Sequence, residues 1–256
     1  CLLSRGLGDV YKRQDLHINN HRQGPGSDNT VKKALALTGI NSEQELQIAD
    51  IGCGTGASSI LLAQELPKAH ITAVDFLAPF LEKLKSDAKD KDVADRITTI
   101  EADMADLPFT ENQFDMIWSE GAIYNIGFKK GIDLWKPFLK KDGYMVLTEI
   151  TWLRTDIPQE LKDHWEQEYP EIDFVSEKIK QLEQAGYEIL GYFPLSEDCW
   201  TNNYYTPIKE GMDAFLERNN HEPEAQEIAE TEHQEHELYL KHKKYISYGC
   251  YVMRKV

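Results

Sequence analysis

The chain has 256 residues, with 28 Lys and Arg against 44 Asp and Glu, and a formal net charge of −16. Nucleic acids and anionic membranes attract mainly Lys and Arg, so this balance argues against both as partners. The length suits one large globular domain, and no apolar run approaches the ~20 residues of a membrane-spanning helix.

Residues 1–14 are the first distinct segment of the chain. They read CLLSRGLGDVYKRQ, begin with Cys rather than Met, and carry three basic residues against one acidic residue. They lack the longer apolar stretch and the small-residue cleavage site of a signal peptide. We interpret this segment as a cloning or gene-assembly scar or a ragged start, and we expect the functional domain to span residues 15–256.

Residues 28–150 alternate between helix-like and strand-like patterns of apolar residues. The predicted elements are, in chain order, a helix at 28–38, a strand at 46–51, a helix at 57–66, a strand at 71–74, a helix at 78–89, strands at 97–100 and 114–118, a helix at 127–139 and a strand at 143–150. Such alternation predicts βαβ units and a parallel sheet, which binds its ligand at the carboxyl ends of the strands.

Residues 151–256 are organised differently. We predict helices at 159–168 and 176–185, and strands at 187–194 and 246–254. An insertion at 195–245 separates the two strands and contains a Glu- and His-rich helix near 222–244. We interpret segments 151–175 and 195–245 as a helical lid, and the acidic helix as a solvated face rather than a metal site.

The glycine-rich segment Asp50–Ala57 connects the first predicted strand to the next helix. Glycines there let the backbone approach a ligand closely, and a helix N-terminus favours a negative group. The pattern Gly52-x-Gly54-x-x-Ala57 satisfies the dinucleotide fingerprint of NAD-dependent enzymes. The longer pattern Asp-x-Gly-x-Gly-x-Gly resembles motif I of the class I S-adenosylmethionine (SAM)-dependent methyltransferases.

Acidic residues at the ends of the next two strands help to distinguish the two cofactors. Asp75 ends the second strand, where a carboxylate can accept both ribose hydroxyls of either cofactor. Asp103 ends the third strand. The resemblance implies that Asp103 accepts from the adenine amino group, that the backbone of Met104 reaches a ring nitrogen, and that Asp50 helps to hold the methionine amino end. Acids at three successive strand ends favour SAM over NAD.

The resemblance extends over about residues 28–150 and over the two closing strands. Within the family, the chain is most similar to small-molecule methyltransferases related to the menaquinone and ubiquinone C-methyltransferases, through Arg22–Ser27 and Trp118–Gly127. It implies a Rossmann-like α/β fold: a seven-stranded, mostly parallel sheet with an antiparallel last strand, helices on both faces and an inserted helical lid. The predicted SAM-binding residues are Gly24, Gly26, Asp50, Gly52, Cys53, Gly54, Thr55, Gly56, Asp75, Phe76, Asp103, Met104 and Ser119.

Methyl transfer from a sulfonium is an in-line displacement, in which the enzyme mainly aligns the reactants. A base is needed only where the acceptor must lose a proton. We predict catalytic roles for Glu120 and Tyr124, which follow the fourth strand, and for His21. The structural alternatives are a helix-start carboxylate, a packed ring and a solvated imidazole. His17 is a further choice of base.

Four aromatic residues in the predicted lid are the expected substrate contacts: Trp152, Trp200, Tyr204 and Tyr205. They follow the fifth and sixth strands, in regions that cover the substrate in the family. Aromatic rings suit a planar substrate by stacking or a methylated amine by cation–π attraction. Ordinary packing between lid and sheet is the alternative.

The four cysteines, Cys1, Cys53, Cys199 and Cys250, are widely spaced and form no Cys-x-x-Cys pair. This spacing argues against a disulfide framework and a zinc ribbon, and it favours a reducing compartment. We therefore expect a cytoplasmic protein without a structural metal. We also expect a monomer or homodimer.

The predicted function is the transfer of a methyl group from SAM to a small molecule, with S-adenosylhomocysteine as the second product. Two alternatives stay open: an NAD-dependent oxidoreductase, and a SAM-binding protein without catalytic activity. A nucleic-acid methyltransferase is a weaker alternative, because Ser119–Ala122 stands where base-methylating enzymes often carry an Asn/Asp-Pro-Pro-Tyr motif.

Overall fold

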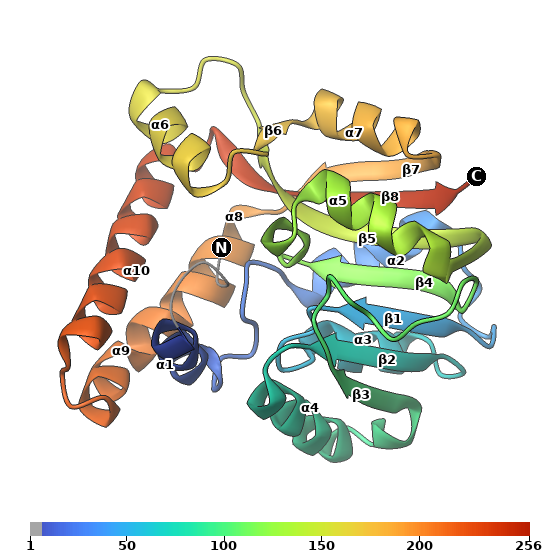
Figure 1. The fold of residues 1–256 in the computed structure, drawn as a ribbon, viewed down its shortest axis with the longest axis horizontal. Coiled ribbons are helices and arrows are strands. Elements are labelled where there is room, and N and C mark those ends of the chain that lie inside the picture. The colour runs from blue at the N-terminus through green and yellow to red at the C-terminus, as the bar shows by residue number, and fades with distance from the viewer. Residues whose placement is uncertain (1–6) are drawn as a thin grey trace.

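The computed structural model describes residues 7–256 (Figure 1). Its strands are, in chain order, β1 (Gln47–Ile51), β2 (His70–Asp75), β3 (Ile97–Glu101), β4 (Phe114–Glu120), β5 (Leu139–Trp152), β6 (Asp173–Phe174), β7 (Tyr187–Pro194) and β8 (Ile246–Lys255). The sheet has the order β3-β2-β1-β4-β5-β8-β7, with β6 beside β5. Strand β8 runs antiparallel to both β5 and β7, and the other pairs are parallel. The predicted seven-stranded sheet with an antiparallel last strand is confirmed, and the short β6 is an addition.

Helices cover both faces of this sheet and the edge at which its parallel strands end (Figure 1). The α-helices are, in chain order, α1 (Leu7–His17), α2 (Asp28–Thr38), α3 (Ala57–Glu65), α4 (Ala78–Asp90), α5 (Phe128–Trp135), α6 (Gln159–Glu168), α7 (Val175–Gln184), α8 (Glu197–Trp200), α9 (Thr206–Arg218) and α10 (Pro223–His242). Short 3₁₀ turns lie at Ala94–Arg96, Ile123–Asn125 and Lys136–Phe138, and a π-helical turn at Thr201–Tyr205 joins α8 to α9.

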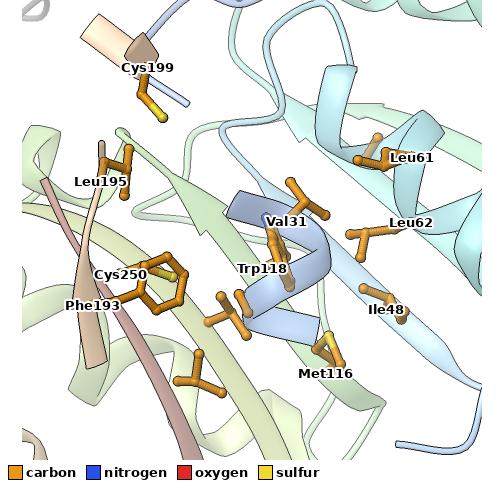
Figure 2. Packing of buried hydrophobic residues seen from close by; sticks show 14 of the residues in the cluster. Val31, Ile48, Leu61, Leu62, Met116, Trp118, Phe193, Leu195, Cys199 and Cys250 are labelled. Carbon is orange, nitrogen blue, oxygen red and sulfur yellow. The ribbon is translucent and has the colours of Figure 1, made fainter. Parts of the chain in front are cut away.

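Two hydrophobic cores lie on opposite faces of the sheet, because successive side chains of a strand point to opposite sides. Trp118 of β4 packs with Val31 of α2 and Leu62 of α3 in one core (Figure 2). Its neighbour Ile117 packs with Phe128 of α5 in the other core. The sheet is therefore shielded on both faces, and its strand ends are left to form a site.

Helix α2 shows how local sequence sets a boundary near that site. Ser27 Oγ accepts a hydrogen bond from the Thr30 amide at 3.1 Å, which caps the first turn. Gly39 ends the helix in the left-handed region, with a φ of 68°. The predicted bounds of this helix are confirmed, so the segment Arg22–Ser27 is fixed at its C-terminal end.

Helices α6, α9 and α10 lie beyond the carboxyl ends of the parallel strands, with α1 beside α9 and α10 (Figure 1). They include the segments that we interpret as a lid. A small core joins Leu16 of α1 to Ile208 and Phe215 of α9 and Ile228 of α10. Within residues 7–256, none of the helices is both long and apolar enough to cross a membrane.

Helix α1 runs through the expected domain boundary at residue 15 without a break. Lys12 Nζ lies 3.1 Å from a Glu222 carboxylate oxygen and 2.7 Å from one of Glu224. Arg13 Nη1 lies 2.8 Å from Glu232 Oε1. The structure thus places Lys12 and Arg13 against α10. The interpretation of residues 1–14 and the domain bounds 15–256 stay predictions. Residues 1–6 lie outside the described part of the chain.

Candidate functional site

The glycine loop between β1 and α3 is a sharp turn at the centre of the sheet edge. Gly52, Gly54 and Gly56 have φ values of 74°, 55° and 87°, in the left-handed region that favours glycine. The amides of Gly52 and Cys53 both donate to the Val74 carbonyl, at 2.8 and 2.9 Å. A Cβ on Gly52 would lie 2.4 Å from the Ala122 Cβ, so only glycine fits there.

Asp75, at the end of β2, is tied to this loop. Its Oδ2 accepts from the Gly54 amide at 2.8 Å, and its Oδ1 accepts from the Leu77 amide at 3.0 Å. Each carboxylate oxygen keeps a further lone pair, so the side chain can still accept from two hydroxyls. Burial raises the pKa of Asp75, and the two backbone bonds oppose that rise.

Asp50, the acid that precedes the first glycine, is buried in β1 and 1% exposed. Its Oδ2 accepts from Ser59 Oγ at 2.6 Å. Burial raises the pKa of Asp50 to about 7, against a smaller lowering by the Ser59 hydroxyl. This carboxyl group therefore changes its charge within the physiological pH range.

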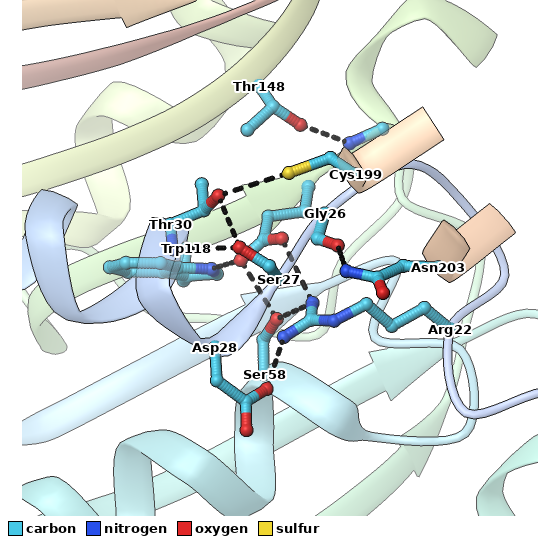
Figure 3. A network of polar contacts seen from close by, with 12 residues as sticks. Arg22, Gly26, Ser27, Asp28, Thr30, Ser58, Trp118, Thr148, Cys199 and Asn203 are labelled. Carbon is cyan, nitrogen blue, oxygen red and sulfur yellow. Dashed lines mark hydrogen bonds and ion pairs between the residues drawn. The ribbon is translucent and has the colours of Figure 1, made fainter. Parts of the chain in front are cut away.

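Glu120, at the end of β4, accepts hydrogen bonds from Trp118, Ser58 and Arg22, and Figure 3 shows these three donors close together. Its Oε1 accepts from Trp118 Nε1 at 2.7 Å and from Ser58 Oγ at 2.9 Å. Its Oε2 accepts from Arg22 Nη1 at 3.2 Å. The Arg22 guanidinium is 6% exposed and also donates to Asp28 Oδ1 at 3.1 Å. Glu120 thereby anchors the segment Arg22–Ser27 over the end of the sheet.

Gln23 contacts the glycine loop from the same segment. Its Oε1 accepts from the amide and the hydroxyl of Thr55 at 2.9 and 3.0 Å. Its Nε2 donates to the carbonyls of His17 and Asn20 at 3.2 and 2.9 Å. This residue, which couples the end of α1 to the loop, is missing from our predicted site. In the sequence, only its position directly before Gly24 indicated a role at the site.

A first cavity of about 200 Å³ opens at the carboxyl ends of β1, β2 and β4. Nine of the predicted SAM-binding residues line it: Gly24, Asp50, Gly52, Cys53, Gly54, Asp75, Phe76, Asp103 and Met104. The Phe76 ring is 51% exposed and available for stacking. Glu120 and Tyr124 also line this cavity, so the structure brings two of the three predicted catalytic residues together.

Four other predicted SAM-binding residues lie beside the first cavity instead of on its wall: Gly26, Thr55, Gly56 and Ser119. Ser119 Oγ donates to the Ile51 carbonyl at 2.8 Å and joins β4 to β1. Gly26 packs against Glu120, where an added Cβ would lie 3.0 Å from Oε2. These residues shape the site without facing its interior.

A second cavity, of about 240 Å³, adjoins the first and shares Gly24, Gly121 and Tyr124 with it. Trp200, Tyr204 and Tyr205 line it, as expected of substrate contacts. Trp152 lines neither cavity and is 5% exposed. Strand β5 continues two residues past its predicted end, so Trp152 pairs with Ile246 inside the sheet and packs in the core. This placement gives its predicted substrate role no support.

The two histidines near the end of α1 are placed differently. His21 has a side chain 76% exposed and lines neither cavity, which gives its predicted catalytic role no support. His17 lines the second cavity, with its ring parallel to that of Tyr204 at a centroid distance of 6.0 Å. Burial, followed by the nearby Arg13 charge, lowers the pKa of His17 to about 4. Its imidazole is thus neutral at pH 7.

Comparisons with known proteins agree with this architecture. Residues 48–143 match the methyltransferase domain family. The malonyl-[acyl-carrier protein] O-methyltransferase of Priestia megaterium is 38% identical over 108 residues, which are 40% of this chain and 38% of that protein. The demethylmenaquinone methyltransferase of Bacteroides fragilis is 26% identical over 133 residues, 52% of this chain and 54% of that protein. The chain therefore spans about half or less of the length of these relatives.

The fold has close counterparts among solved structures. A SAM-dependent methyltransferase from Geobacter sulfurreducens, solved with S-adenosylhomocysteine, superimposes with a TM-score of 0.81 at 18% identity, over 96% of this chain and 97% of that chain. A SAM-dependent methyltransferase from Thiobacillus denitrificans gives the same TM-score and identity, over 96% of this chain and 98% of that chain. The predicted fold class and the resemblance on which it was based are confirmed.

Proposed function

We propose that this chain, which carries a methyltransferase domain at residues 48–143 and has the class I methyltransferase fold, transfers a methyl group from SAM to a small molecule. One observation carries the proposal: a cavity lined by the glycine loop, Asp75 and Asp103 shares wall residues with a second cavity lined by aromatic rings. Two adjoining cavities suit a cofactor and an acceptor that must meet.

The side chains of the first cavity fit the chemistry of SAM. At one end, Arg22 is available for a carboxylate, and Asp50 and Glu120 are available for an ammonium group. Asp75 can accept from two ribose hydroxyls. At the other end, Phe76 offers a ring for stacking and Asp103 an acceptor for an amino group. The set thus suits a ligand with a zwitterionic end, a diol and a flat base.

The residues of the chain would bind, orient and shield the reactants. When bound, SAM would supply an activated methyl group to a nucleophilic C, N or O atom of the acceptor, with the electron pair of the broken carbon–sulfur bond left on sulfur. Tyr124 lines both cavities and would orient the acceptor. His17 lines only the second cavity and is neutral at pH 7, but its lowered pKa of about 4 makes it a weak base for a hydroxyl or amine. Glu120 would act as a positioning residue through Arg22.

The location and assembly of the protein stay predictions. We keep the expectation of a cytoplasmic monomer or homodimer that acts on a small molecule. The net charge of −16 continues to disfavour a nucleic-acid acceptor.

Calorimetric titration with S-adenosylhomocysteine and with NADH tests the cofactor. We expect S-adenosylhomocysteine to bind at least about 100-fold more tightly. Tighter binding of NADH would favour an oxidoreductase and contradict the proposal. Incubation of the purified protein with metabolite extract and methyl-labelled SAM then tests catalysis. Label should enter a small molecule, whereas tight SAM binding without any labelled product would indicate a binding protein that lacks catalysis.

Cofactor binding should depend on pH through Asp50, whose carboxyl pKa is about 7. An ammonium group beside Asp50 stabilises the carboxylate, so binding should release a proton and strengthen as the pH rises. We expect the affinity for S-adenosylhomocysteine to increase about three- to tenfold between pH 6 and pH 8. The stability of the ligand-free protein should show the opposite pH dependence. Because the pKa of Asp50 is raised by folding, the free energy of unfolding should fall as the pH rises through about 7.

Asp50→Asn is the matched variant for this pH dependence, since it keeps the size of the side chain and removes the titration. Its affinity for S-adenosylhomocysteine should be lower than that of the wild type and nearly constant from pH 6 to pH 8. If the wild type and the variant showed the same pH profile, Asp50 would not be the group that titrates.

A further inference from the structure

The segment Arg22–Ser27 lies between the two cavities. Three of its residues line both of them: Gln23, Gly24 and Pro25. On the side of the first cavity, Arg22 Nη1 donates to Glu120 Oε2 at 3.2 Å. Gln23 Oε1 accepts from the amide of Thr55, in the glycine loop, at 2.9 Å. The position of this segment is therefore set by residues that line or adjoin the first cavity.

Asn203 joins the same segment to the predicted lid. Its Nδ2 donates to the Gly26 carbonyl at 2.7 Å across 177 positions of the chain, and Figure 3 shows the side chain reaching that carbonyl. Asn203 lies in the π-helical turn Thr201–Tyr205, a rare kind of turn that often occurs at functional sites. The neighbouring Asn202 is exposed and donates to Asp198 Oδ1 of α8 at 3.0 Å. The side chains of the two asparagines therefore contact different parts of the molecule.

The two residues that follow Asn203 are Tyr204 and Tyr205, and both line the second cavity. Their positions depend on the backbone of the turn, so the bond from Asn203 to the segment also helps to place the two rings. A second contact supports Tyr204, whose ring lies parallel to that of His17 at a centroid distance of 6.0 Å. The His17 carbonyl in turn accepts from Gln23 Nε2 at 3.2 Å. One short segment therefore contacts the glycine loop on one side and supports the wall of the second cavity on the other.

We propose that Asn203 is a positioning residue that couples the two cavities, so that a ligand in the first cavity orders the tyrosine wall of the second. This inference rests on the proposed function, since it concerns how the cofactor prepares the acceptor side of the same site. A ligand that contacts Gln23 and Gly24 stabilises the segment, and the bond from Asn203 transmits that stabilisation to the turn. The coupling is reciprocal, so an ordered turn also favours the ligand. The acceptor should therefore bind more tightly once the first cavity is filled.

Hydrogen–deuterium exchange of the full chain, with and without S-adenosylhomocysteine, measures this coupling. In the wild type, the ligand should slow the exchange of backbone amides at least about fivefold both in residues 22–27 and in residues 199–206. Asn203→Ala should abolish the slowing in residues 199–206 and keep it in residues 22–27. Because the coupling is reciprocal, this variant should also bind S-adenosylhomocysteine about fivefold more weakly in a calorimetric titration. Asn202→Ala, the matched control from the same turn, should behave like the wild type in both measurements.

The outcomes separate this inference from the function on which it rests. Equal slowing of residues 199–206 in the wild type and in Asn203→Ala, or equal effects of Asn202→Ala and Asn203→Ala, would overturn the inference. Asn203→Asp keeps the size of the side chain and removes the donor, so it gives a second reading should Asn203→Ala prove unstable in a thermal melt. Tight binding of S-adenosylhomocysteine to the wild type with slowing confined to residues 22–27 would overturn the coupling alone. A wild type that does not bind this ligand would contradict the proposed function itself.

Discussion

Replacing Asp75 with Ala is expected to lower the affinity for S-adenosylhomocysteine by roughly 100-fold. The substitution removes a charged acceptor for two ribose hydroxyls, and hydrogen bonds to a charged group contribute about 1.5–3 kcal/mol each. It also removes the bonds that Asp75 accepts from the amides of Gly54 and Leu77, which hold the glycine loop beside β2. Calorimetric titration measures the affinity, and a thermal melt checks that the variant is folded.

Two further variants separate the ribose contact from the support of the loop. Asp75→Asn keeps one carbonyl acceptor for a backbone amide but loses the charge, and we expect an intermediate affinity. Glu101 of β3 is exposed, pairs with Asp75 of β2 and does not line the first cavity, so Glu101→Ala should bind S-adenosylhomocysteine like the wild type. A fall of less than about threefold for Asp75→Ala would contradict the proposed contact with ribose.

The largest loss of stability is expected from Lys178→Met. Lys178 of α7 and Glu149 of β5 form an ion pair of 2.9 Å, and both side chains are 0% exposed. Tyr169 Oη donates to the same Glu149 oxygen at 2.6 Å, so the pair also holds a ring of the second cavity. Removing the cation leaves a buried carboxylate without its charge partner, which typically costs about 3–5 kcal/mol. Chemical denaturation measures the free energy of unfolding.

Controls for this stability prediction come from the same helix and from the partner residue. Lys180→Met removes a lysine whose side chain is 62% exposed and should change the free energy of unfolding by less than about 0.5 kcal/mol. Adding Glu149→Gln to Lys178→Met should restore part of the loss, because no buried charge remains. If Lys178→Met were as stable as Lys180→Met, the buried ion pair would contribute little to the free energy of unfolding.

The loss of stability in Lys178→Met should depend on pH in a direction that follows from the pKa of Glu149. Burial raises the pKa of Glu149, and the Lys178 charge opposes that rise. Without Lys178, the folded-state pKa should be higher still, and a raised carboxyl pKa means that stability is lost as the pH increases through it. The difference in stability between wild type and Lys178→Met should therefore shrink as the pH falls from 8 to 5.

Local sequence patterns were sufficient to predict which residues gather around the first cavity. The alternation of strands and helices over residues 28–150 is encoded by the period of apolar residues, and the observed strands follow it closely. The residues Asp50, Asp75 and Asp103 each end or nearly end a parallel strand, so their gathering at one edge follows from the topology alone. The glycine pattern likewise predicts a tight turn that the φ values confirm.

The second cavity and the segments around it depend on contacts between distant parts of the chain. Trp152 was predicted to lie in the lid because the sequence does not show how far β5 extends. Its length is decided by pairing with β8, about 100 residues later. Gln23 contacts Thr55 across 32 positions, and no spacing rule predicts that meeting. Residues 1–14 were set aside for their unusual composition. Among them, Arg13 contacts Glu232 of α10 across 219 positions, which local sequence patterns do not predict.

The acidic residues behind the net charge of −16 show which features the sequence determines and which depend on the tertiary structure. The sequence by itself determined the parallel sheet, the glycine turn and the acids at the strand ends, because each depends on neighbouring residues and on a periodic pattern. Only the tertiary structure decided which of the 44 acidic side chains face a cavity. Glu232 and Glu235 face the second cavity while Glu237 faces solvent, because the packing of α10 against α1 and α9 sets the rotation of that helix.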